Sequence, residues 1–256
     1  MILFKYGGHA ITNDQGIDPV LVLLAERIKA GEKIVIVHGG GPAINRELDV
    51  HGIKSEFVGG FRKTTPEVLE VVQRTLCGEV LRGLVNQLIA LEINAVGLTA
   101  GDGNLIRAKI SKPELGLVGE VLSTNPKFLF ELMDNGVTPV ISPLSITFDG
   151  QVVNMNADIV AGAIGGSLGA NCVLFSTDVA GIFRNWPDET SFIESISVEE
   201  LIQISHTFEG GMIPKAEAAI NAIKSGAKKV QIFDGRSVDN VKNALVFNGG
   251  TLVTSS

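Results

Sequence analysis

Cysteine is scarce in this sequence, and nothing in the chain couples its two cysteines to chemistry. Cys77 and Cys172 are the only two among 256 residues, they form no C-x-x-C pair, and neither has a histidine at metal-ligand spacing. Disulfide frameworks and zinc sites need closely spaced groups of this kind. We therefore predict two reduced cysteines that pack as small apolar side chains.

Positive charge is also in short supply. The chain has 21 Lys and Arg residues against 28 Asp and Glu residues, which gives a formal net charge of -7 and a pI near 5.2. A nucleic-acid-binding surface needs clustered Lys and Arg. The composition therefore argues against a nucleic-acid partner.

Long apolar runs are missing as well. The opening apolar stretch before Lys5 is only three residues long, and the most apolar later stretch, 160–168, is interrupted by glycine. Both are far shorter than the roughly 20 residues that a bilayer span needs. We expect no signal peptide, no membrane association and a cytoplasmic location.

The signatures of several enzyme classes are absent. The P-loop pattern G-x-x-x-x-G-K-[ST] does not occur, and the glycines 39–41 are followed by Pro-Ala-Ile rather than completing G-x-G-x-x-G. This weighs against P-loop NTPases and typical dinucleotide-binding folds. We recognise no catalytic triad or nucleophile elbow, and H-E-x-x-H is absent, so we expect neither a hydrolase nor a protein-ligated metal centre.

What the sequence does contain is a regular alternation of short apolar runs and amphipathic stretches. This predicts an α/β fold with an open, mostly parallel sheet sandwiched between helices, in an αβα arrangement. The expected strands are 2–6, 33–37, 95–98, 138–141, 172–175, 229–233 and 251–253, and the expected helices are 19–30, 42–51, 66–91, 126–135, 157–169, 198–205, 214–225 and 238–247. Two hairpins interrupt the rhythm, one around the Asp149-Gly150 turn and one within 106–121. We expect two lobes, 1–168 and 169–256, that share one sheet.

A run of three glycines, Gly39-Gly40-Gly41, follows the apolar run 34–37 and precedes Pro42. Glycines let backbone N–H groups approach a ligand closely, and proline suits the first turn of a helix. A strand, a bare glycine turn and a helix start together predict an anion site. The chain opens with a similar unit, an apolar run followed by Lys5 and the pair Gly7-Gly8.

Four further clusters carry polar or charged groups, and the first three have a plain structural alternative. In 154–158 (N-M-N-A-D), Asn and Asp either cap a helix or hold a substrate and orient a cation. Arg62 in 59–64 either binds a carboxylate or lies in an exposed basic loop. Lys215, which follows Gly210-Gly211, is either placed to bind an anion or is a solvated surface lysine. The polar turn 176–183 follows a strand, where α/β sheets bind ligands.

Taken together and in order, these clusters resemble the amino acid kinase family, and within it the kinases that act on N-acetylglutamate. The motifs are K-Y-G-G (5–8), V-H-G-G-G-P (37–42), G-F-R-K-T (60–64), A-V-G-L (95–98), V-N-M-N-A-D (153–158), T-D-V-A-G-I (177–182) and G-G-M-I-P-K (210–215), and they cover almost the whole chain. The segment 185–188 (N-W-P-D) is also similar to this subgroup. The resemblance implies ATP-dependent phosphorylation of the γ-carboxylate of N-acetyl-L-glutamate, the second step of arginine biosynthesis.

The resemblance also implies roles for individual residues. The amino acid and a homodimer contact would belong to the N-terminal lobe, 1–168, and ATP to the C-terminal lobe, 169–256. The phosphoryl group would be flanked by Lys5 and Lys215, oriented by Asp158. The substrate would be held by Gly40, Gly41, Arg62, Asn154 and Asn156. The nucleotide would be bound by Gly8, Asp178, Val179, Ala180, Gly181, Ile182, Phe183, Thr207, Phe208, Glu209, Gly211 and Met212. Mg2+ would be held mainly by the ATP phosphates and water.

The sequence departs from the family pattern in two places, and two alternative functions stay open. His9 stands where relatives carry a small polar residue, and the sequence shows no extra N-terminal helix of the kind found in arginine-inhibited hexamers, so we expect a homodimer insensitive to arginine. One rival is a sister kinase acting on another acidic substrate, such as an N-blocked aminoadipate. The other is a non-catalytic sensor of the same fold, against which the presence of Lys5, Asp158 and Lys215 argues.

Overall fold

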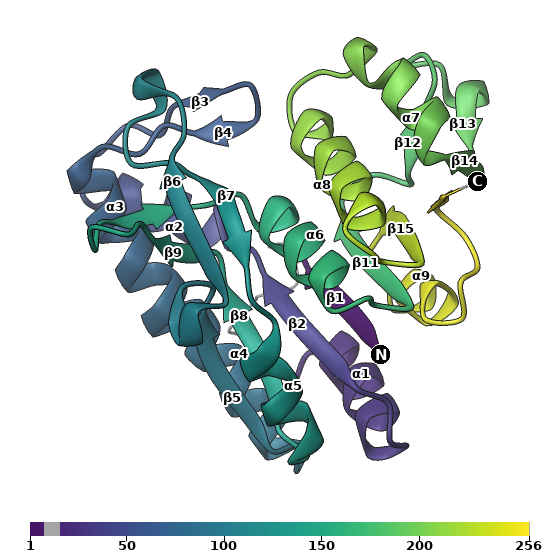
Figure 1. The fold of residues 1–256 in the computed structure, drawn as a ribbon, viewed down its shortest axis with the longest axis horizontal. Helices are drawn as coiled ribbons and strands as arrows, with labels where there is room; N and C mark the ends of the chain where they lie inside the picture. Colours follow the sequence, from purple (N-terminus) through teal and green to yellow (C-terminus); the bar gives the residue numbers. More distant parts are fainter. Residues whose placement is uncertain (8–15, 256) are drawn as a thin grey trace.

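The computed structural model describes residues 1–7 and 16–255, and its centre is an eight-stranded sheet (Figure 1). From one edge to the other the strands are β14 (Ser195–Ser197), β16 (Thr251–Thr254), β15 (Lys229–Asp234), β11 (Cys172–Thr177), β1 (Ile2–Tyr6), β2 (Ile34–His38), β8 (Thr138–Ser142) and β5 (Ala95–Thr99). Among these strands only the pair β15–β16 is antiparallel. The predicted mostly parallel sheet is confirmed, and each predicted strand is present.

Helices cover both faces of this sheet, so the predicted three-layer arrangement is confirmed. One face packs against α1 (Pro19–Lys29), α4 (Leu81–Ala90) and α9 (Val238–Ala244). The other face packs against α5 (Lys127–Asp134), α6 (Ala157–Ser167), α7 (Val198–Ile204) and α8 (Met212–Lys224). The central strands β1, β2 and β11 are buried along their whole length, as apolar strands covered on both faces should be.

The two predicted hairpins are present in a four-stranded sheet of order β10-β9-β6-β7. Its strands are β6 (Ile106–Ile110), β7 (Gly119–Thr124), β9 (Leu144–Ile146) and β10 (Val152–Asn154). Two short hairpins were not predicted: β3 (Phe57–Val58) with β4 (Phe61–Arg62), and β12 (Ile182–Phe183) with β13 (Phe192–Ile193). Short 3-10 turns cover Asp102–Asn104 (η3), Pro113–Leu115 (η4), Glu189–Ser191 (η5) and Ser205–Thr207 (η6).

The predicted single helix 66–91 is wrong in its middle. It consists of α3 (Pro66–Gln73), a π-helical segment η2 (Arg74–Val80) and α4, and it packs near α2 (Gly41–Val50). The wider π turn re-aims the side chains that it carries. It places Leu76 so close to Gly40 that a Cβ on this glycine would lie 2.5 Å from Leu76 Cδ2.

The eight-stranded sheet runs through the expected division between residues 168 and 169. Four of its strands, β1, β2, β5 and β8, come from the first part, and the other four come from the second part. Because β1 pairs with β11 across this division, the two parts share one continuous layer of hydrogen bonds.

Helices α6 and α8 lie side by side near the middle of the molecule and approach each other through glycine (Figure 1). A Cβ on Gly162 would lie 2.5 Å from the carbonyl oxygen of Ala218, and one on Gly166 would lie 2.9 Å from that of Ala222. Residues four apart share a helix face, so Gly162 and Gly166 lie on the same face as Asp158. The contact therefore fixes the distance between α8 and the helix that carries Asp158.

The Gly162→Ala variant tests this contact. The added methyl group meets backbone atoms of α8, which cannot rotate away, so we expect a loss of about 1–3 kcal/mol in the free energy of unfolding. Gly83→Ala in α4 is the control, because its Cβ would have no neighbour within 4 Å, and it should stabilise by about 0.4–1 kcal/mol. Urea unfolding of both variants decides the matter, and equal effects would contradict a special role for Gly162.

Candidate active site

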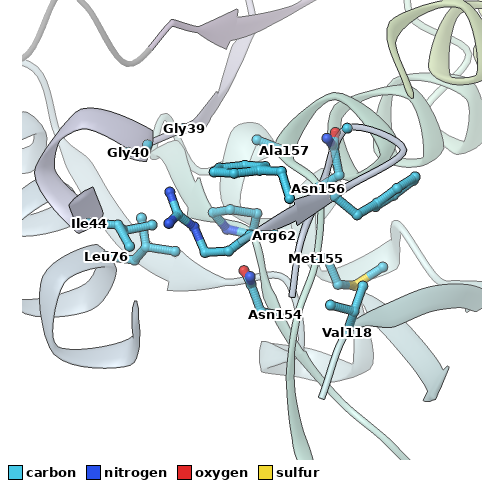
Figure 2. A pocket seen from close by; sticks show the side chains of 15 residues that line it. Gly39, Gly40, Ile44, Arg62, Leu76, Val118, Asn154, Met155, Asn156 and Ala157 are labelled. Atoms are coloured by element: carbon cyan, nitrogen blue, oxygen red, sulfur yellow. The ribbon is translucent and has the colours of Figure 1, made fainter. Parts of the chain in front are cut away.

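One cavity, referred to below as the first cavity, lies where β2 ends and has a volume of about 160 Å3 (Figure 2). Its walls come from the glycine turn and α2, the β3–β4 hairpin, η2, and the segment between β10 and α6. The lining residues are Gly39, Gly40, Gly41, Ile44, Phe57, Gly60, Phe61, Arg62, Leu76, Val118, Pro143, Asn154, Met155, Asn156 and Ala157. The five residues expected to hold the substrate, Gly40, Gly41, Arg62, Asn154 and Asn156, thus line one cavity.

The glycine turn presents the start of α2 to this cavity. Gly40 is the N-cap of α2, and no described side chain caps the helix there. The first N–H groups of a helix have no partner within the helix, and its dipole favours negative charge at that end. This end of the cavity is suited to an anion.

Arg62 is buried beside the cavity and is held on three sides. Its Nη2 donates to Asn45 Oδ1 at 2.8 Å, its Nη1 donates to Ser55 Oγ, and its guanidinium carbon lies 4.6 Å from the centre of the Phe57 ring. In Figure 2 the guanidinium is turned toward the start of the helix that carries Gly40 and Ile44. Burial lowers the pKa of Arg62 to about 10, so the group stays charged at neutral pH. The alternative of an exposed basic loop is wrong.

The two asparagines of the N-M-N-A-D motif have different settings. Asn154 is buried, and its Nδ2 donates to Thr64 Oγ1 at 3.1 Å, which fixes the orientation of the amide. Asn156 is the N-cap of α6, and its Oδ1 accepts from the N–H groups of Asp158 and Ile159 at 2.8 and 3.2 Å. The capping prediction is confirmed for Asn156, which also lines the cavity.

Asp158 is buried between two lysines from distant segments. Lys5 Nζ on β1 lies 3.0 Å from Oδ1, and Lys215 Nζ on α8 lies 3.1 Å from Oδ2. Burial by itself would raise the pKa of this carboxyl group, but the two ammonium groups outweigh it and lower the pKa below its ordinary value. This cluster of three side chains therefore carries one negative and two positive charges at neutral pH. It lies between the two cavities, since Ala157 lines the first and Lys215 lines the second.

His38 is the buried last residue of β2, directly before the glycine turn, and the sequence prediction gave it no role. Its Nδ1 lies 2.7 Å from the carbonyl oxygen of Gly39, and because a carbonyl only accepts, Nδ1 carries the proton. Burial lowers the pKa of His38 to about 4, so the ring is neutral at physiological pH. The ring steadies the peptide that precedes Gly40.

The second cavity is larger, about 610 Å3, and lies at the carboxyl ends of β11 and β12. Its lining residues are Thr177, Asp178, Val179, Gly181, Phe183, Arg184, Asn185, Trp186, Thr207, Phe208, Glu209, Gly211, Met212 and Lys215. Most residues expected to bind the nucleotide are among them. Ala180 and Ile182 are not: Ile182 is buried, and its N–H donates to Thr251 Oγ1 at 2.8 Å. Gly8 and His9 lie outside the described residues.

The tip of the β3–β4 hairpin links the walls of the two cavities. Gly60 has a φ of 82°, and a Cβ there would lie 2.6 Å from the carbonyl oxygen of Gly210 and 3.0 Å from Pro214 Cδ. Gly60 lines the first cavity, while Gly211 and Lys215, which follow Gly210, line the second. The two cavities therefore share a backbone contact that requires glycine.

Disulfide bonds, a protein-ligated metal ion and a membrane-spanning helix find little support in the described part of the chain. Both cysteines are free thiols, Cys172 buried and Cys77 half-buried, as predicted. No group of three or more His, Cys, Asp or Glu side chains is placed to hold a metal ion among residues 1–7 and 16–255. None of the helices that the structure describes is long and apolar enough to cross a membrane.

The segment 165–169 (G-G-S-L-G) matches the pattern G-x-S-x-G, contrary to the expectation of no nucleophile elbow. A nucleophile elbow needs its serine on a sharp turn from a strand into a helix. Ser167 is instead the last residue of α6, and its hydroxyl donates to the carbonyl oxygen of Ile164 at 3.0 Å. The match has no catalytic geometry.

Comparison with known proteins gives consistent findings. The model of the amino acid kinase family matches residues 1–234. A protein of Corynebacterium urealyticum named acetylglutamate kinase is 38% identical over 264 residues, covering 100% of this chain and 87% of that protein. Acetylglutamate kinase of Arthrobacter sp. is 40% identical over 252 residues, covering 92% and 80%. The crystal structure of smu.665 from Streptococcus mutans superposes with a TM-score of 0.83 at 27% identity, covering 100% of this chain and 98% of that one.

The Asp158→Asn variant tests the buried charge cluster. It leaves two ammonium groups close together with no counter-charge, so we expect the free energy of unfolding at neutral pH to fall by about 3 kcal/mol or more. Asp134→Asn is the control, because its ion pair with Lys33 is exposed and should change stability by less than about 1 kcal/mol. Similar losses in both variants would contradict the role of Asp158.

The lowered pKa of Asp158 predicts that the stability difference between the native protein and Asp158→Asn depends on pH. Because the folded pKa of Asp158 is lowered, its contribution is present at neutral pH and is lost as the pH falls through that pKa. The difference in unfolding free energy between the native protein and Asp158→Asn should therefore shrink below about pH 4, the ordinary range of carboxyl groups. Urea unfolding at pH 7 and in the acid range measures it.

Proposed function

Since the chain belongs to the amino acid kinase family, we propose that it transfers the γ-phosphoryl group of ATP to the γ-carboxylate of N-acetyl-L-glutamate. The products are ADP and an acyl phosphate, and the reaction is the second step of arginine biosynthesis. The observation that carries the proposal is Asp158 with Lys5 and Lys215 between two cavities. The relatives named acetylglutamate kinase supply the identity of the substrate.

We assign the amino acid to the first cavity. Gly40 and Gly41 would offer backbone N–H groups to the γ-carboxylate at the start of α2. Arg62 and Asn154 would hold the α-carboxylate end, with Asn156 beside them. The support is that all five residues line this cavity and that a charged guanidinium, fixed by three contacts, can pair with a carboxylate at little further cost in entropy.

The proposed phosphoryl transfer requires positive charge near the reacting groups rather than a general base. A carboxylate with an ordinary pKa near 4.3 is already ionised at neutral pH, so the nucleophile needs no deprotonation. The difficulty is to bring a carboxylate and a triphosphate together. Lys5 and Lys215 would stabilise negative charge on the moving phosphoryl group and the leaving oxygen, and Asp158 would hold the two ammonium groups in position.

We assign ATP to the second cavity. Asp178, Val179, Gly181, Phe183, Thr207, Phe208, Glu209, Gly211 and Met212 line it, as does Lys215. The backbone beside Ala180 and Ile182, and Gly8 outside the described residues, would complete the binding surface. Mg2+ would be held by the phosphates and water, where it would neutralise phosphate charge.

The larger organisation follows from the same assignment. Residues 1–168 would form an amino-acid lobe and residues 169–256 a nucleotide lobe. We propose a homodimer formed through the first of these, because β5 is an edge strand with all five residues partly exposed. A cytoplasmic location fits the acidic, cysteine-poor composition.

The experiment that tests the function is an ADP-release assay with N-acetyl-L-glutamate, N-acetylaminoadipate, aspartate and glutamate. We expect the highest kcat/KM with N-acetyl-L-glutamate. A preference for another acid would identify a sister kinase, and no ADP release with any of them would favour a non-catalytic sensor.

Lys5→Ala and Lys215→Ala test the catalytic charges. Each removes charge that acts mainly in the transition state, so we expect kcat to fall at least ~100-fold while both substrates still bind. Lys127→Ala is the control, because this lysine is exposed on α5 and far from catalysis in our assignment. Near-normal turnover in either site variant would contradict the assignment.

Arg62→Ala tests the substrate cavity. The change removes a buried charge-assisted contact, so KM for N-acetyl-L-glutamate should rise by tenfold or more, with a smaller change in KM for ATP. Arg62→Lys should recover only part of the loss, because an ammonium group cannot reproduce the planar fork. An unchanged KM for the amino acid would remove Arg62 from this role.

A further inference from the structure

The chain contains a single tryptophan, Trp186, and the fold leaves it on the rim of the second cavity. The residue is 68% exposed, which is unusual for so large an aromatic side chain. The catalytic scheme above gives it no task. An exposed aromatic ring at the mouth of a cavity provides a binding surface for a ligand with an apolar face.

Trp186 is held in place although it is exposed. Its ring lies 5.1 Å from the ring of Phe183 at an interplanar angle of 63°, and Phe183 lies 5.3 Å from Phe192 at 62°. Phe183 and Phe192 are paired across the β12–β13 hairpin. The three rings therefore form one continuous aromatic cluster, of which Trp186 and Phe183 form a wall of the cavity.

The loop that carries Trp186 is closed by hydrogen bonds on either side of it. The N–H of Arg184 donates to the carbonyl oxygen of Ser191 at 2.9 Å, and that of Asn185 donates to Ser191 Oγ at 3.0 Å. The N–H of Asp188 donates back to the carbonyl oxygen of Asn185 at 2.8 Å. Ordering of this loop is therefore largely complete before a ligand arrives, which favours binding.

The rest of the cavity has the complementary character. Gly211 and Lys215 line it at the start of α8, where helix geometry and a cation suit phosphate groups. Phe208 and Met212 add apolar surface. A volume of about 610 Å3 with an anion-binding part and an aromatic wall matches a molecule with a charged chain and a planar ring.

We propose that Trp186 is the stacking surface for the base of the nucleotide and that it gives the cavity a preference for purines over pyrimidines. The proposal rests on the assignment of the nucleotide to the second cavity. Stacking on an aromatic side chain strengthens the binding of a base, and a purine offers the larger ring surface. Phe183 contacts the indole edge-to-face and is itself packed against Phe192, which keeps the indole positioned.

Fluorescence of the native protein gives the first test, because all tryptophan emission comes from Trp186. Titration with ADP should change the emission in a saturable way, and titration with N-acetyl-L-glutamate alone should not. Binding of ADP seen by calorimetry without any change in emission would overturn the proposal. So would an emission change that follows protein concentration rather than nucleotide, since that would mean that Trp186 contacts a second copy of the chain.

Variants give the second test. Trp186→Ala should raise the Kd for ADP about tenfold and raise that for UDP much less, while Trp186→Phe should keep most of the affinity. Phe148→Ala is the matched control, because Phe148 is a 75% exposed aromatic residue that lines neither cavity, and it should leave both Kd values unchanged. An equal loss for ADP and UDP in Trp186→Ala would show a structural role only and overturn the proposal.

These measurements separate the proposal from the function on which it rests. ADP binding requires no acceptor, so failure of every acid in the ADP-release assay would leave the fluorescence and affinity results valid. Normal phosphoryl transfer to N-acetyl-L-glutamate with unchanged ADP affinity in Trp186→Ala would leave the kinase intact and remove Trp186 from base recognition.

Discussion

The site depends on one buried carboxylate that holds two ammonium groups. Asp158 brings Lys5 and Lys215 to the same point from segments more than 200 residues apart in the sequence. Burial alone would raise the pKa of Asp158, and the two ammonium groups beside it lower that pKa instead. The central sheet, α6 and α8 must therefore be aligned closely enough for these three charges to meet.

The alignment is provided by the backbone rather than by long side chains. Gly162 and Gly166 let α6 approach α8 until carbonyl groups of α8 lie where a Cβ would be. Asp158 and Lys215 stand at the starts of these two helices. Lys5 stands on β1, in register with Phe175 on β11, so the sheet fixes the third partner. Small residues at one helix crossing thus set the geometry of the charged centre.

The sequence predicted the sheet, most helices and the gathering of motifs, because buried parallel strands read as apolar runs and their carboxyl ends share one edge. The sequence could not predict which side chains from distant segments come into contact in the fold. Of the partners of Arg62, Asn45 comes from α2, whereas Ser55 and Phe57 lie just before and on β3, and no sequence pattern links the two sets. The π turn at 74–80 has no local signal in the sequence either, and in the structure it packs Leu76 against Gly40.

The contact between Gly60 and the carbonyl of Gly210 has a consequence for how substitutions combine. Changes at the hairpin tip and at the start of α8 act on one shared backbone contact, although each faces a different cavity. Free-energy effects add only for sites that share no partner. Double-mutant cycles between the two cavity walls should therefore give coupling energies that depend on this contact, and variants selected for one ligand will alter the response to the other.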